Sequence, residues 1–285
     1  MIQSMTGYGK HVIQLPTKKI TVEIKSLNSK SLDLNTRVPS AYRQKELTIR
    51  KLLASGLTRG KVDLNLFVES TGEQTATKIN ETTVRQYMEQ LSRVAPADQV
   101  ELLKMAVKMP DALKTEREEI DEDEFSEILK AVTQALVEIN TYRTDEGEVL
   151  KNDFLQRIAM IGKHLQEVLA IDSQRIELVK QRLRSAVSEL KEKVDENRFE
   201  QELIYYLEKY DITEEKVRLE NHLSYFKEAI HSDESNGKKL GFISQEIGRE
   251  INTIGSKSNF APMQQLVVQM KDELEKIKEQ ALNVL

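Results

Sequence analysis

KVDLNLFV, the stretch from Lys61 to Val68, alternates polar and apolar residues with a period of two, which is typical of a strand with one buried face. The same alternation marks KITVEI at residues 19–24 and SLDLN at residues 31–35. Residues 41–56 carry leucines at helical spacing and end in a glycine, which predicts a helix before the last strand. The order strand, strand, strand, helix, strand predicts a small α+β unit with a mostly antiparallel sheet.

The chain that follows this unit has the spacing of helices. Asn80 has a side chain suited to an N-cap, which predicts a helix to about Val94, and another helix is expected over 125–142. A proline-free run then covers residues 146–194. Such an uncapped run predicts a coiled-coil arm or a helical hairpin, with a kink expected at Gly147 near its start.

Three shorter helices are expected after this arm. They cover residues 213–231 with Thr213 as N-cap, residues 239–254 with a stop at Gly255, and residues 262–285. The expected fold class is therefore α+β: a small, mostly antiparallel N-terminal sheet domain, a long helical arm and a C-terminal helical domain. The expected boundaries are 1–72 for a basic α+β core whose region extends to about residue 155, 73–145 for helices of that region, 146–210 for the arm and 211–285 for the C-terminal domain.

Composition excludes several classes of protein. The chain has no cysteine, so disulfide frameworks, thiolate zinc sites and cysteine nucleophiles are excluded, and the chain suits a reducing cytoplasm. No apolar run approaches the roughly 20 residues of a transmembrane span, and residues 1–10 lack the core of a signal peptide. We therefore expect a cytoplasmic protein with no membrane partner.

Charge is unevenly distributed along the chain. Residues 1–70 carry twelve basic and five acidic residues, a net charge of +7, so the remainder carries −12 of the total of −5. A basic unit joined to an acidic one can bind a polyanion, because the local potential decides where the polyanion binds. The alternative is a solvated face on a small domain.

A convergent polar row is expected on the helix that covers residues 213–231. Its buried stripe consists of Leu219, Leu223, Phe226 and Ile230. Glu215, Arg218 and His222 fall on one flank of that stripe, within about 60° of one another. The alternative is a surface salt bridge between Glu215 and Arg218 beside a half-buried histidine.

The next helix carries two carboxylates one turn apart. Glu246 and Glu250, at i and i+4, suit a shared hard cation such as Mg²⁺ or Mn²⁺, which takes oxygen ligands. Arg249 and Lys257 can stabilise a phosphate. The alternative is that basic neighbours pair with these carboxylates.

Spaced motifs along nearly the whole chain resemble the YicC/YloC family. In the N-terminal region they are MIQSMTGYG at 1–9, EIKSLN at 23–28 and LTRGKV at 57–62. In the C-terminal region they are EE at 214–215, RL at 218–219, HL at 222–223, KLGF at 239–242, QE at 245–246 and REINTIGSKS at 249–258. The resemblance implies a bacterial, cytoplasmic endoribonuclease that hydrolyses internal phosphodiester bonds of RNA. It also implies dependence on a divalent metal, with Mn²⁺ favoured and Mg²⁺ possible, and a ring-like homo-oligomer, a hexamer, whose channel admits RNA.

The resemblance also implies roles for individual residues. Glu246 and Glu250 become metal ligands, and His222, beside Glu215, becomes the acid/base group or a third ligand. Arg218, Arg249 and Lys257 neutralise the charge that develops on the phosphorane. Lys25, Asn28, Arg59 and Lys61 contact RNA phosphates.

Two functions from different classes are compatible with these residues. One is the RNA-cleaving enzyme, which requires Glu246, Glu250 and His222 to converge on one cavity. The other is a non-catalytic, oligomeric RNA-binding adaptor in which the same rows form structural salt bridges. Residues that point to separate neighbours favour the adaptor.

Overall fold

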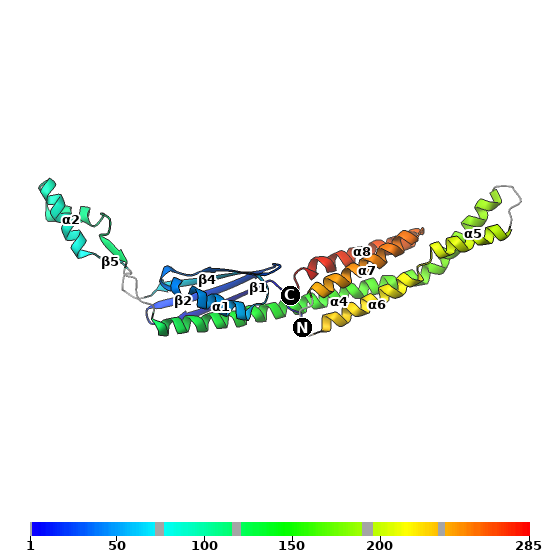
Figure 1. Cartoon of the computed structure of the whole chain (residues 1–285), viewed down its shortest axis with the longest axis horizontal. Coiled ribbons are helices and arrows are strands. Elements are labelled where there is room, and N and C mark those ends of the chain that lie inside the picture. The colour runs from blue at the N-terminus through cyan, green and yellow to red at the C-terminus, as the bar shows by residue number, and fades with distance from the viewer. Residues whose placement is uncertain (1, 72–76, 116–120, 190–195, 233–236) are drawn as a thin grey trace.

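The computed structural model describes residues 2–71, 77–115, 121–189, 196–232 and 237–285. The molecule is elongated: helix α4 (Glu122–Glu189) runs along a four-stranded sheet and continues along a group of C-terminal helices (Figure 1). The expected α+β class is confirmed. Among the described residues, no helix is both long and apolar enough to cross a membrane.

The main sheet has the strand order β1-β2-β4-β3. Its strands are β1 (Gly7–Gln14), β2 (Lys18–Leu27), β3 (Leu32–Arg37) and β4 (Gly60–Ser70). β2 pairs antiparallel with β1 and β4, whereas β3 pairs parallel with β4. The prediction of a mostly antiparallel sheet is therefore confirmed. Alternation along β2 and β4 directs Val22 and Leu64 into the core and leaves Lys25 and Lys61 exposed on the opposite face.

The remaining elements are mostly helices. A 3₁₀ turn, η1 (Ser40–Lys45), leads into α1 (Glu46–Gly56), and a two-stranded sheet of β5 (Thr77–Ile79) and β6 (Leu113–Thr115) accompanies α2 (Glu81–Val94) and α3 (Gln99–Ala106). After α4 come α5 (Glu196–Lys209), α6 (Thr213–His231), α7 (Gly237–Lys257) and α8 (Ala261–Ala281). The expected N-cap of α2 is confirmed, because the Asn80 side chain accepts a hydrogen bond from the backbone N–H of Thr83.

The two helices expected over 125–142 and from 146 onward are one helix, α4. Gly147 lies within this helix and does not mark a kink. A glycine is needed here because the backbone of Ile2 passes close by, and a Cβ on residue 147 would stand 2.1 Å from the Ile2 carbonyl oxygen. α4 therefore crosses the boundary expected at residue 145. Its first part covers the sheet, and its middle part packs in the core formed with α6, α7 and α8. The end expected at about residue 194 lies outside the described residues.

Several other element boundaries differ from those expected. Ile212 occupies the N-cap position of α6, so Thr213 is the first helical residue and not the cap. α7 continues past Gly255, whose bare backbone accommodates Val267 of α8. β1 has no apolar alternation because a Cβ on Gly9 would stand 2.2 Å from the Ala135 carbonyl oxygen, where α4 lies against the strand. The short strands β5 and β6 were also not expected.

Both ends of the chain lie where the sheet meets the C-terminal helices (Figure 1). The backbone N–H of Leu285 donates to the Gln3 carbonyl, and the N–H of Met5 donates to the Asn283 carbonyl. Arg143 of α4, only 1% exposed, donates to the Met5 carbonyl beside them. The two halves of the molecule are thus joined by both termini as well as by α4.

Candidate active site

The candidate site lies on the facing sides of α6 and α7, which a short connection makes antiparallel neighbours. On α6, Glu215 and His222 are seven residues apart and share one side. On α7, the same spacing places Glu250 on the side that carries Lys257, with Glu246 one turn further along. We call the contact zone between these two sides the α6–α7 seam.

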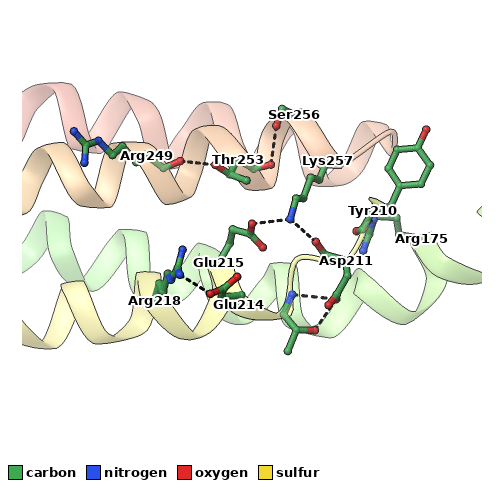
Figure 2. A network of polar contacts seen from close by, with 11 residues as sticks. Arg175, Tyr210, Asp211, Glu214, Glu215, Arg218, Arg249, Thr253, Ser256 and Lys257 are labelled. Carbon is green, nitrogen blue, oxygen red and sulfur yellow. Dashed lines mark hydrogen bonds and ion pairs between the residues drawn. The ribbon is translucent and has the colours of Figure 1, made fainter. Parts of the chain in front are cut away.

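One end of the seam is closed by an ion pair between the two helices. Lys257 Nζ lies 2.7 Å from Glu215 Oε1 and donates to the Asp211 carbonyl oxygen at 2.9 Å (Figure 2). The Glu215 side chain is buried, and its second oxygen, Oε2, has no hydrogen-bond partner. Lys257 therefore holds a buried carboxylate that retains capacity to accept a further hydrogen bond.

Asp211 is a member of this network that the sequence reading missed. Its carboxylate accepts hydrogen bonds from the backbone N–H and the hydroxyl of Thr213, at 3.1 and 2.7 Å. The Thr213 hydroxyl lowers the pKa of Asp211 below its ordinary value, more than burial raises it. An aspartate two residues before the first helical residue is a common helix-entry signal, and it could have identified this residue.

The salt bridge considered between Glu215 and Arg218 is not formed. Arg218 pairs with Glu214 one turn earlier on the exposed side of α6, whereas Glu215 faces α7 and pairs with Lys257 (Figure 2). The reason is the helical period, because Glu214 shares the solvent side with Arg218 and Glu215 lies on the buried side. Arg218 is exposed and its surface pair contributes little, so the guanidinium is accessible to a ligand.

The two carboxylates of α7 have different environments. Glu246 pairs with Arg249 at 2.7 Å, as the alternative interpretation expects. Glu250 is only 8% exposed, and no hydrogen bond or ion pair joins it to another residue in the described part of the chain. His222, half-buried on α6, likewise has no such partner there. An acid and an imidazole without internal partners are the groups of the seam that remain available for chemistry.

The candidate metal ligands do not form a complete site within one chain. Among the described residues, no three His, Cys, Asp or Glu side chains are grouped closely enough to hold an ion. Glu246, Glu250 and His222 thus share the seam without converging as the enzyme hypothesis requires. Mg²⁺ commonly takes one or two carboxylates and completes its shell with water and substrate phosphates, so Glu250 and Glu246 fit only that mode of binding.

The four candidate RNA contacts of the N-terminal half fall into two groups. Lys25 and Lys61 are exposed on the open face of the sheet, where Lys25 Nζ lies 5.6 Å from the centre of the Tyr8 ring. The Asn28 amide donates to the Leu282 carbonyl at 2.7 Å, and Arg59 Nε donates to the Ser29 carbonyl at 2.7 Å. Asn28 and Arg59 therefore make bonds within the chain, whereas the two lysine side chains have no hydrogen bond or ion pair to another described residue.

Comparison with known proteins covers nearly all of the chain. A family model described as "Endoribonuclease YicC-like, N-terminal region" matches residues 2–152, and one described as "Endoribonuclease YicC-like, C-terminal" matches residues 168–285. A protein of Clostridioides difficile (strain 630), named "Probable endoribonuclease YicC", is 35% identical over the whole of both chains. A protein of Haemophilus influenzae with the same name is 28% identical, again over the whole of both chains.

Proposed function

Since the chain belongs to the YicC-like endoribonuclease family and is an RNA-cleaving hydrolase, we propose that it cuts internal phosphodiester bonds of RNA at the α6–α7 seam with the help of a divalent metal ion. The observation that supports this location is Glu250, a glutamate only 8% exposed whose side chain has no hydrogen-bond or ion-pair partner among the described residues. Glutamates this little exposed are usually paired, so one without a partner is a candidate for function.

Three basic side chains lie near Glu250 and His222 in the seam. Lys257 lies at one end, and Arg218 and Arg249 project from the exposed sides of the two helices (Figure 2). Phosphodiester hydrolysis adds negative charge to the non-bridging oxygens in the transition state, and cations placed there lower the barrier. His222 is the proposed proton donor or acceptor, because imidazole changes charge near neutral pH.

The proposed metal is Mn²⁺, with Mg²⁺ as a substitute. Glu250 and Glu246 would hold it, the second after releasing Arg249, and RNA phosphates and water would supply the other ligands. A bound divalent ion would polarise a phosphoryl oxygen and lower the pKa of a coordinated water. Binding of the ion would also compensate the unpaired charge of Glu250.

RNA is proposed to contact the open face of the sheet through Lys25 and Lys61, both of them exposed. We further propose a cytoplasmic homo-oligomer, a hexameric ring with a channel for RNA. This proposal is supported by the elongated outline of the single chain and by exposed apolar side chains on its peripheral helices, among them Ile204 and Tyr205 of α5 (Figure 1).

The test is cleavage of an end-labelled, structured RNA by purified protein in Mn²⁺, in Mg²⁺ and in chelator. The wild type and Glu246→Gln are compared from parallel preparations. We expect internal cuts that need the metal and disappear in the variant. Cuts that persist in chelator would contradict the metal proposal, and cuts that persist in Glu246→Gln would remove that residue from the site. Tight, salt-sensitive binding without any cleavage would favour the adaptor.

A further inference from the structure

Two exposed aromatic side chains lie beside the seam and take no part in the proposed chemistry. Tyr225 of α6 is 45% exposed and Phe242 of α7 is 62% exposed. Neither ring stacks on another aromatic ring in the described part of the chain. Both rings lie on otherwise polar helix surfaces. Large exposed apolar side chains next to a candidate site commonly mark a binding surface, so these two rings are candidates for part of one.

The helical period places the two rings opposite each other. Arg218 and Arg249 stand on facing helices at the same end of the network (Figure 2). Tyr225 follows Arg218 by seven residues and Phe242 precedes Arg249 by seven. Because α6 and α7 are antiparallel, both steps lead two turns, about 10 Å, in the same direction and return to the same side. Tyr225 and Phe242 therefore lie side by side along the outer edge of the seam, two turns beyond Arg218 and Arg249.

Contacts around the rings support this placement. Lys239 Nζ of α7 lies 5.0 Å from the centre of the Tyr225 ring, so this end of α7 reaches the tyrosine. A Cβ added at Gly241, next to Phe242, would meet nothing within 4 Å. The surface beside Phe242 is thus open, and a cation already lies against the face of Tyr225.

We propose that Tyr225 and Phe242 bind an unpaired nucleobase of the RNA substrate, with Lys239 beside them for the adjoining phosphate. This inference rests on the proposed function, because it extends the path of the RNA from the arginines of the seam. Aromatic rings recognise unpaired bases by stacking, and every base has a face that can stack. The seam therefore selects RNA that is single-stranded next to the cut, because bases within a duplex have both faces covered.

An RNA base fits these rings better than a second copy of the chain. The rings continue the line of Arg218, Arg249 and Lys257, each of which now pairs with a glutamate and can exchange that glutamate for an RNA phosphate. Lys239 against the ring combines a phosphate contact with a stacking surface, as single-strand binding grooves do. A contact between copies remains the competing explanation for exposed rings, and the experiment below separates the two.

The experiment measures binding of a fluorescently labelled single-stranded RNA in chelator, so that no cleavage occurs. Wild type, Tyr225→Ala, Phe242→Ala and Tyr225→Phe are compared, with Tyr142→Ala of α4 as control for an exposed tyrosine on another helix. We expect Kd to rise about tenfold in each of the first two variants. Tyr225→Phe, which retains the ring, and Tyr142→Ala should bind as the wild type does. The same RNA annealed to its complement should show less than about a twofold change in any variant.

Two results would overturn the proposal. One is unchanged single-strand binding in both Tyr225→Ala and Phe242→Ala while the wild type binds RNA. The other is a fall in molecular mass, measured by light scattering, in the variants that lose binding, because the rings would then join copies of the chain. If the wild type neither binds nor cuts RNA, the proposed function itself fails. This outcome is distinct from the first two.

Discussion

The two halves of the molecule use their polar side chains differently. In the N-terminal half, Asn28 and Arg59 make hydrogen bonds within the chain, and Lys25 and Lys61 are exposed on the open sheet face. In the α6–α7 seam, Glu250 and His222 are free of internal partners although both are at least half-buried. A little-exposed glutamate without a partner is uncommon in proteins, whereas an exposed lysine is not. This contrast underlies the proposal that the helical half carries out the chemistry and the sheet half binds RNA by its charge.

The largest effect is expected from Glu250→Gln. This change keeps the shape of the side chain and removes its charge, so cleavage should fall at least about a hundredfold if the carboxylate holds the metal. RNA binding in chelator should stay within a few-fold of wild type. Initial rates and equilibrium binding, measured on the same RNA, check both statements.

Glu220→Gln, a change at an exposed glutamate on another side of α6, is the matched control and should cleave as the wild type does. Loss of binding in proportion to loss of cleavage in Glu250→Gln would contradict its role as a metal ligand. The seam would then be a binding surface, and the contrast between the halves would disappear.

The next effect concerns stability. Lys257→Met should lower the free energy of unfolding by about 1–3 kcal/mol, because it leaves the buried Glu215 carboxylate without its ion-pair partner. Adding Glu215→Gln should recover part of this loss, since no buried charge remains unpaired. Urea unfolding of the two variants and the wild type measures both values. Equal stability of Lys257→Met and wild type would show that the pair is not formed in solution.

The sequence predicted the features of the site that depend on helical periodicity, but not those that depend on contacts between distant residues. The sides of α6 and α7 followed from the helical period, which is why Glu215 and His222 were correctly placed on one side of their helix. The partner of Glu215 could not be predicted, because Lys257 reaches it from a helix 42 residues away in sequence. Spacing along α6 also allowed Arg218 to pair with either Glu214 or Glu215, and the structure shows the pair with Glu214.

The same limit applies to the fold. The alternating strands were predictable, but β1 was not, since Gly9 replaces an apolar residue where α4 lies against the strand. The continuity of α4 through Gly147 was also hidden, because the glycine serves the approach of Ile2 rather than a kink. The hydrogen bonds that Asn28 and Arg59 make within the chain could not be predicted, because they depend on the C-terminal residues and a loop carbonyl. Contacts that are distant in sequence decided each of these cases.

A smaller effect is expected in the sheet half. Lys25→Ala with Lys61→Ala should weaken RNA binding several-fold and reduce the salt dependence by roughly 0.7 per lost phosphate contact on single-stranded RNA. Lys51→Ala, at an exposed lysine of α1 on the covered side of the sheet, is the control and should leave both quantities unchanged. Binding measured at several salt concentrations provides the slope. An unchanged slope in the double variant would remove the open sheet face from the RNA path.

The smallest effect concerns pH. Hydrogen bonds from Thr213 hold the pKa of Asp211 below its ordinary value, so the folded state binds this proton less readily than the unfolded state. Asp211 therefore contributes stability above the ordinary aspartate pKa of about 3.9, and this contribution is lost as the pH falls below that value. The Asp211→Asn variant should show a shallower loss of stability on acidification, measured by thermal unfolding at a series of pH values. An identical pH dependence in variant and wild type would contradict this role.

The central claim is that the α6–α7 seam performs the cleavage and the sheet face binds RNA. Single-turnover cleavage at increasing enzyme concentration tests it most directly, with Glu250→Gln compared against the Lys25→Ala, Lys61→Ala double variant. We predict that Glu250→Gln loses the rate at saturation and keeps the concentration for half-saturation, whereas the double variant raises that concentration and keeps the rate. A full saturating rate in Glu250→Gln, or a lost saturating rate in the double variant, would contradict the claim.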